Sequence, residues 1–305
     1  MKVIKSTTIT EAILTATDVP ETDEAEWSSA TTYADGALVM VTGTGGGAAS
    51  ATHEIYESQQ GSNTGNDPTI DDGTYWTRVS STNRWKMFND IVQEQTEQAG
   101  GLEVELTPAA VTTALAAVNV DCADIDVVMV DPVEGTVFSQ NYPMTSYSGI
   151  TNWYDYFFEA IVRKNELAVI GLPPYSSATI TVTFNDAGTA KVGALVIGTA
   201  ATIGDSQYGA SFGIIDYSTK NVDAQGRTTI TAGAYADEAD IDVIIETSRF
   251  AQVKSVLTDL RTTPSVWVPE ENTDGTIIYG YYREFDVILS GPVVSLCSIQ
   301  IEGLT

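Results

Sequence analysis

The sequence is poor in the residues that most metal sites and nucleophilic enzymes use. Its 305 residues include two cysteines and one histidine. Cys122 and Cys297 each lie in an apolar run, so we expect buried free thiols rather than a disulfide. This inventory leaves little for a zinc site, and we expect neither a bound metal nor a cofactor. His53 follows a glycine-rich loop, and we interpret it as an exposed polar residue at the entry to a strand.

Basic residues and long apolar runs are also scarce. The chain has 14 Lys and Arg against 41 Asp and Glu, which gives a net charge of -27. Such a chain repels phosphate backbones and anionic membrane surfaces, so neither nucleic acid nor a membrane surface is an expected partner. No run of 18 apolar residues is present, which predicts no membrane span. The start, MKVIKSTTITEAIL, turns polar before an apolar signal core, so we expect synthesis and initial retention in a cytoplasm.

What is abundant is the composition of β-strands and turns. Most segments after residue 101 are rich in Val, Ile, Thr and Tyr and are bounded by Gly, Pro and Asn-Asp turns. One segment, SRFAQVKSVLTDLRTTP, has apolar residues at helical spacing, with Ser248 as a cap and Pro264 as a stop. TPAAVTTALAAV is compatible with a helix or with a strand and turn. The sequence A-D-I-D-V occurs within 122–131 and again within 238–247. This repeat indicates either two similar strands of a duplicated sandwich or a chance similarity.

These signals predict a mostly β protein in four regions. We expect a small aromatic-rich β-module followed by a larger antiparallel β-sandwich with one or two short helices. The expected boundaries are an extended N-terminal arm at 1–22, with a short helix at TEAILTA, the small module at 23–88, a polar linker at 89–101, and the sandwich at 102–305.

Several short motifs suggest chemistry, but their context favours simple turns. GTGGG at 43–47 lacks the G-K-[ST] of a phosphate-binding loop and predicts a flexible hairpin loop. NDPTIDDGT at 66–74 is rich in oxygen ligands, but its spacing is not that of a calcium loop, which favours a plain turn over a calcium site. The only histidine is His53, so a catalytic triad is not expected. Among 41 acidic residues some pair always suits sugar hydrolysis, so the count carries no information. We therefore expect that the protein is not an enzyme.

Aromatic residues are concentrated in the small module. They are Trp27, Tyr33, Tyr56, Tyr75, Trp76 and Trp85. A unit this short has a small core and relies on aromatics to build it. Exposed aromatic rings also stack on sugars. Neighbouring residues on a strand point to opposite faces, so one of Tyr75 and Trp76 is free to face outward.

The order of these residues resembles the small chitin-binding modules of carbohydrate-binding families 5 and 12. WSSATTYADGALV is similar to the family's W-x-x-x-x-x-Y-x-x-G-D-x-V, with Ala37 in place of the usual acid. EIYESQQGSNTGNDP and YWTRV match the rest, with an enlarged loop at 42–53. The resemblance covers about residues 25–80 and implies polysaccharide binding by exposed aromatics. The candidate carbohydrate-binding residues are Trp27, Tyr33, Tyr75 and Trp76.

Most of the chain also resembles tail and baseplate structural proteins of tailed bacteriophages. TNRWKMFND after such a module and the β-rich ending YGYYREFDVILSGPVVSLCSIQIEGLT carry this likeness. It implies a non-enzymatic virion protein, made in the host bacterial cytoplasm, that forms a trimer or hexamer with other phage structural proteins as partners. The N-terminal arm would add a strand to a neighbour's sheet. The alternatives are a receptor-binding or fibre-associated protein that grips host glycan through residues 25–80 and, third, a glycan hydrolase.

Overall fold

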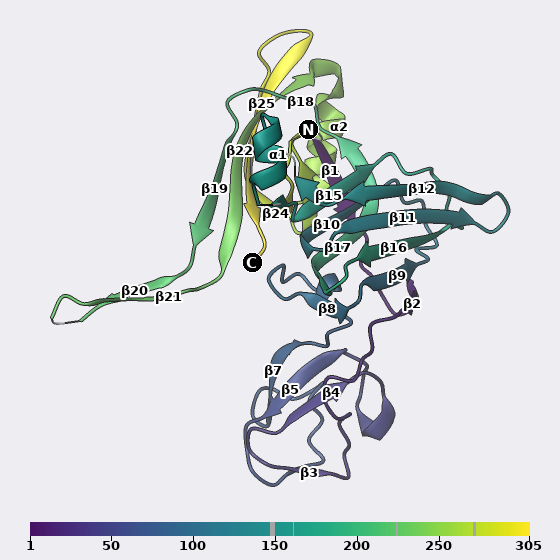
Figure 1. Ribbon diagram of the computed structural model, residues 1–305, viewed down its shortest axis with the longest axis vertical. Coiled ribbons are helices and arrows are strands. Elements are labelled where there is room, and N and C mark those ends of the chain that lie inside the picture. The colour runs from purple at the N-terminus through teal and green to yellow at the C-terminus, as the bar shows by residue number, and fades with distance from the viewer. Residues whose placement is uncertain (147–149, 161, 224, 271–272) are drawn as a thin grey trace.

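The computed structural model confirms a mostly β protein with a small module, a β-sandwich and two short α-helices (Figure 1). It describes residues 1–305 except 147–149, 161, 224 and 271–272. In Figure 1 the small module lies below the larger body, and a long two-stranded ribbon extends to the left of the body. Among the helices of the described residues, none is long and apolar enough to cross a membrane.

The small module is built from short strands joined by long turns. Antiparallel pairing gives a three-stranded sheet in the order β4-β5-β7 and a separate pair, β3-β6. The bounds are β3 Thr32–Tyr33, β4 Leu38–Val41, β5 Glu54–Ser58, β6 Asn63–Thr64 and β7 Trp76–Ser81. A 3-10 turn at Gly45–Gly47 lies between β4 and β5. The structure thus has a strand-and-turn module where the aromatic-rich sequence predicts one.

The body is organised around one large sheet of eleven strands. Its main path runs β15-β10-β17-β1-β23-β24-β25-β22-β18, with β8 paired to β17 and β19 paired to β22. The bounds are β1 Lys2–Ser6, β8 Thr96–Ala99, β10 Ala114–Asp121, β15 Glu166–Ile170, β17 Thr189–Thr202, β18 Asp205–Ser206, β19 Ser211–Asp216, β22 Tyr235–Glu246, β23 Ser265–Val268, β24 Ile278–Ile288 and β25 Val294–Gly303.

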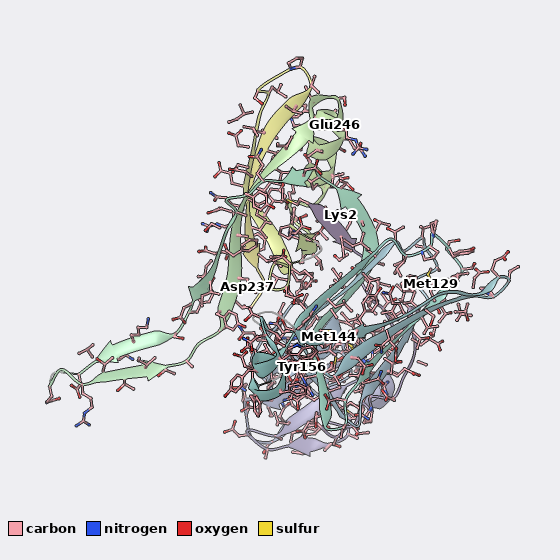
Figure 2. The ribbon with its side chains drawn as sticks, turned by 45° about the horizontal axis from the view of Figure 1, so that its top comes forward. Lys2, Met129, Met144, Tyr156, Asp237 and Glu246 are labelled. Atoms are coloured by element: carbon pink, nitrogen blue, oxygen red, sulfur yellow. The ribbon has the colours of Figure 1, made fainter. Side chains whose placement is uncertain are left out.

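The N-terminal segment is a central strand of this sheet and not a free arm. β1 pairs with β17 on one side and with β23 on the other, and Lys2 marks its start in Figure 2. Val3 and Ile4 are fully buried, on opposite faces of the sheet. The expectation that this segment adds a strand to a neighbour is therefore wrong for residues 2–5, because both of their edges are already paired within the chain.

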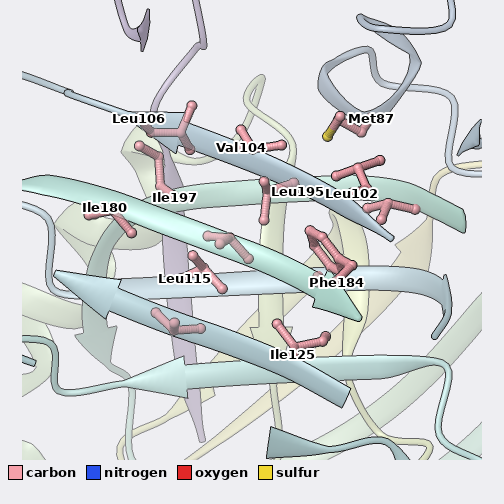
Figure 3. Close-up of a cluster of buried hydrophobic side chains, with 14 of the residues drawn as sticks. Met87, Leu102, Val104, Leu106, Leu115, Ile125, Ile180, Phe184, Leu195 and Ile197 are labelled. Atoms are coloured by element: carbon pink, nitrogen blue, oxygen red, sulfur yellow. The ribbon is translucent and has the colours of Figure 1, made fainter. Parts of the chain in front are cut away.

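A second sheet packs against one half of the large sheet and completes the sandwich. Its order is β12-β11-β16-β9-β2. The bounds are β2 Leu14–Thr17, β9 Leu102–Leu106, β11 Asp124–Asp131, β12 Gly135–Pro143 and β16 Thr179–Asn185. Alternate residues of β11 and β16 point into the core, where Ile125, Ile180 and Phe184 meet Leu115 of β10 and Leu195 of β17 (Figure 3). Period-two alternation of apolar residues in these strands predicts this half-buried arrangement.

Helix α2 (Phe250–Asp259) covers the other half of the large sheet. It buries Val253 and Leu257 against side chains of β22, β24 and β25. The helix predicted from apolar spacing is thus confirmed, but its ends differ. The 3-10 turn Thr247–Arg249 contains Ser248, whose side chain does not cap the helix, and α2 stops five residues before Pro264. The short pieces that remain are the 3-10 turn Lys86–Phe88, β13 Thr145–Ser146, β14 Val162–Arg163, α1 Trp153–Phe158, β20 Thr219–Val222 and β21 Thr228–Thr231.

Two segments with helical alternatives are strands. TPAAVTTALAAV contains the first five residues of β10, in which Ala114 and Ala116 face one core while Leu115 and Ala117 face another. Burial on both faces produces a continuous apolar run, which lacks the polar stripe of a surface helix. TEAILTA forms a turn and the start of β2. Four residues of the expected linker form β8, which pairs with β17, so the linker is partly built into the body.

Candidate functional site

The two tryptophans proposed to bind sugar lie inside the small module. Trp27 and Trp76 are each only 2% exposed and pack with Val39, Val41 and Tyr56. Trp76 Nε1 donates a hydrogen bond to the main-chain oxygen of Asn66, at 2.8 Å. A sugar ring needs an open aromatic face, and neither indole offers one here. These residues therefore act as the core of the module in this structure.

The two tyrosines of the predicted site are half-buried at the edge of that core. The ring of Tyr33 packs edge-on against Trp76, with centroids 5.2 Å apart, and its hydroxyl accepts the backbone N–H of Ser28 at 2.8 Å. Tyr75 also packs against the core, as the neighbour of Trp76 at the start of β7. The structure thus brings all four candidate residues into one cluster, in which only the tyrosines keep part of their surface in contact with solvent.

The glycine-rich loop has a structural reason to be free of side chains. Gly46 has a φ of +69°, and a Cβ there would lie 2.2 Å from the main-chain oxygen of Trp27. The loop folds back onto the residues that follow Trp27, where Ser29 N–H donates to Gly46 O at 2.8 Å. The loop of the hairpin is therefore held against the main chain of residues 27–29 at Gly46, while residues 44–47 remain exposed.

The carboxylates of the 66–74 loop are occupied by the loop itself. Asp71 Oδ2 accepts the backbone N–H groups of Gly73, Tyr75 and Trp76 at 2.9–3.1 Å. Asp67 accepts from Ala49 and Thr69 in the same way. Such hydrogen bonds fix a tight turn. Across the described part of the chain, no group of three or more His, Cys, Asp or Glu side chains is arranged to hold a metal ion.

His53 lies in a junction between the small module and the chain segments that flank it. Its side chain is 12% exposed, and its ring stacks on Trp85 with centroids 4.4 Å apart. Nδ1 lies 2.9 Å from Glu21 Oε1, and Nε2 lies 3.0 Å from Glu11 Oε1. The interpretation of His53 as an exposed polar residue is therefore wrong. Both ring nitrogens face carboxylates, so neither is directed at a serine hydroxyl.

The charges around His53 favour its protonated form. Burial works to lower the pKa of His53, but the hydrogen bond to Glu21 and the charges of Glu21 and Glu11 outweigh it and raise the pKa above 6.5. Burial likewise works to raise the pKa of Glu21, whereas His53, Thr82 and Arg84 hold it below its usual range. The result is a charged junction that ties residues 11 and 21 to the module.

Glu166, a carboxyl whose pKa is raised, also has a structural role. Burial raises its pKa, and backbone N–H groups of residues 275–277 counter this effect by donating to it. Its Oε1 accepts the N–H of Ile277 at 3.1 Å. A buried carboxyl can serve as a general acid, but this one anchors a distant turn to β15 through hydrogen bonds.

The most exposed aromatic surface of the described chain lies outside the small module, on helix α1. Its sequence, WYDYFF, contains five aromatic residues in six, and none of them is buried. Asn152 starts the helix by accepting the N–H groups of Tyr154 and Asp155. Ring contacts with centroids 4.8–6.3 Å apart join Trp153, Tyr156 and Phe157 in one group and Tyr154 and Phe158 in a second. We call the five exposed rings of this helix the α1 patch: Trp153, Tyr154, Tyr156, Phe157 and Phe158. Sequence reasoning missed this patch, although the aromatic density of the segment is a readable signal.

These features define an acidic, mostly β protein with an aromatic-cored module and an exposed aromatic helix. The sequence matches no protein-family model and no curated protein.

Proposed function

We propose that this protein is a non-enzymatic structural component of a bacteriophage virion, in the tail, baseplate or tail tip, that assembles into a symmetric oligomer. The observation that carries the proposal is the α1 patch. Its five rings are 55–77% exposed. At 150–250 Å² for each aromatic side chain, the patch presents on the order of 500 Å² of apolar surface. Soluble monomers rarely expose a contiguous apolar patch of this size, which is typical of interaction sites.

The charge of the chain supports assembly that begins only when a basic partner is present. A net charge of -27 keeps free copies apart and soluble while apolar surfaces stay exposed. Docking onto a basic neighbour in the particle would then relieve the repulsion. The likeness to tail and baseplate proteins supplies the phage context, and the charge and the α1 patch support the structural role.

Glycan binding through residues 25–80 receives less support. The aromatic residues that the resemblance points to are mostly used inside the module, since Trp27 and Trp76 are buried. Tyr33 and Tyr75 are the remaining positions through which that alternative can be tested.

The proposal is tested by the mass of the protein in solution. Sedimentation velocity over a concentration series should give a discrete oligomer such as a trimer or hexamer, and the chain should be recovered in phage particles. The double variant Trp153→Ser, Phe157→Ser should weaken assembly. Val133→Ser is the matched control, because Val133 is 85% exposed in a turn of the β11–β12 hairpin, outside the patch. A monomer at every concentration, absent from particles, would overturn the proposal.

A further inference from the structure

A two-stranded ribbon extends from the body with little of the chain around it. β19 and β22 leave the large sheet as an antiparallel pair, and β20 and β21 continue beyond them (Figure 1). Asp237, labelled in Figure 2, marks the region where β22 leaves the body. All eight residues of β20 and β21 are exposed. An isolated pair of strands is at best marginally stable in water, so the ribbon needs a surface to lie on.

The side chains of β20 and β21 divide into two different faces. Residues directly opposite each other in the antiparallel register share a face. Lys220 lies opposite Ile230, and Val222 lies opposite Thr228. The other face is entirely small and polar, with the pairs Thr219 opposite Thr231 and Asn221 opposite Thr229. Val222 and Ile230 are 66% and 65% exposed. Alternation of this kind is typical of a strand pair with one covered face.

Nearer the body one face of the ribbon again carries large apolar side chains. The register of β19 and β22 places Phe212, Ile214 and Tyr235 on the face that carries Ala239, together with the carboxylates of Asp216 and Asp237. Ala239 itself packs into the core beneath α2, so the exposed face continues an interior face of the sheet. Phe212 is 44% exposed, Ile214 63% and Tyr235 49%. Both sections of the ribbon therefore present apolar side chains that are 44–66% exposed.

We propose that the apolar face of this ribbon lies against the body of a second copy of the same chain. The inference rests on the self-assembly in the proposed function and names one surface that brings it about. The described residues 211–223 and 225–235 provide 24 positions, and about half of a strand pair shares one face. A standard protein interface uses roughly 20–30 residues on each side, so the apolar face of the ribbon supplies about half of one side of such a contact.

Charge identifies a second copy as a suitable occupant. Residues 211–235 contain two acidic residues, Asp216 and Asp223, and two basic ones, Lys220 and Arg227, so the net charge of the ribbon is zero. The rest of the chain therefore carries the whole -27. A neutral ribbon, in which Lys220 pairs with Asp216 at 3.8 Å, can approach the acidic body of another copy, whereas contact between two bodies meets strong repulsion.

The experiment combines amide hydrogen exchange of the ribbon with a matched pair of double variants. Hydrogen exchange, read by mass spectrometry on peptides from 211–238, is measured above and below the concentration at which the oligomer dissociates. Val222→Asp with Ile230→Asp places two charges on the apolar face. Asn221→Asp with Thr229→Asp places the same two charges on the polar face of the same strands. Sedimentation velocity gives the association constant of each variant.

We expect ribbon peptides to exchange about tenfold more slowly in the oligomer, and the apolar-face variant to associate at least about tenfold more weakly than the polar-face control. Equal effects of the two variants, or equal exchange in oligomer and monomer, would overturn the inference while the oligomer upholds the proposed function. A protein that stays monomeric at every concentration would overturn both the ribbon contact and the proposed function. Protection that arises only when another virion protein is added assigns the ribbon to that partner and overturns the second copy.

Discussion

Replacement of Trp76 by alanine should unfold the small module while the body stays folded. Trp76 is the first residue of β7 and is 2% exposed. Its indole N–H donates a hydrogen bond to the main-chain oxygen of Asn66. Tyr33 packs against its ring, so removal of the indole also leaves that tyrosine without its main contact. The module is the part of the chain with the smallest core: its six buried members are Trp27, Val39, Val41, Ala48, Tyr56 and Trp76.

The expected loss is comparable with the whole stability of the module. Truncation of a buried tryptophan to alanine costs about 3–5 kcal/mol. The lost indole hydrogen bond adds about 1 kcal/mol. The predicted module of 23–88 is shorter in the structure, because β7 ends at Ser81 and Met87 packs into the core of the body, which leaves sixty residues, 23–82. At about 0.05–0.15 kcal/mol per residue, its free energy of unfolding is roughly 3–9 kcal/mol. The substitution therefore removes most of that free energy and populates the unfolded module.

The assay must report on the module alone. Hydrogen exchange or limited proteolysis of peptides from 23–82 does so, with peptides from β10 and β17 as an internal reference for the body. Trp153→Ala is the matched control, because it removes the same side chain where it is 77% exposed and outside the module. The control should leave module protection unchanged, within about 0.5 kcal/mol. If Trp76→Ala costs less than about 1 kcal/mol, or behaves like the control, the interpretation of Trp76 as core is refuted.

Three further predictions follow from single residues. The pKa of folded His53 lies above 6.5, so its ion pairs with Glu21 and Glu11 contribute stability that is complete below pH 6.5 and is lost as the pH rises through the folded pKa. The pKa of Glu21 is lowered, so the stability that its ionised carboxylate contributes is lost only in acid. Denaturation midpoints should therefore fall more between pH 6 and 9 in the wild type than in His53→Gln, and parallel profiles would contradict this role. Gly46→Ala should destabilise the module by about 2 kcal/mol or more, because its Cβ meets the oxygen of Trp27 and its φ is positive; Gly45→Ala, with open space around it, should cost much less in the same thermal melt. Burial raises the pKa of Cys122 to about 12 and that of Cys297 to about 11, so neither thiol should react with a disulfide reagent in the native protein, and both should react after denaturation; prompt native-state labelling would refute their burial.

Much of the fold follows from local sequence signals. Alternating apolar residues predict β11 and β22, and both are strands whose alternate residues are buried. The two A-D-I-D-V segments lie in different sheets of the body. Helical spacing predicts α2, and both of its buried side chains come from that pattern. Short-range periodicity is enough here because each element has one buried face and one exposed face.

Pairing between distant segments could not be read from the sequence. β1 lies between β17 and β23, some 200 and 260 residues away along the chain. A polar-flanked strand of five residues carries no signal for its partners, and the sequence near the N-terminus therefore resembles an arm. The same reason explains His53: its partners Glu11 and Glu21 come from a separate segment, and only the fold brings them to the ring.

The aromatic residues show why the candidate site was the hardest feature to predict. A spaced set of Trp and Tyr fits both a sugar platform and a small core, since both need large flat side chains held in place by turns. Burial separates the two, and it assigns Trp27 and Trp76 to the core. A loss of glycan binding in Trp76→Ala would then report the unfolding of the module and not a lost contact. Tyr75, which lies at the edge of the core, is the position at which a test of sugar recognition keeps the module folded.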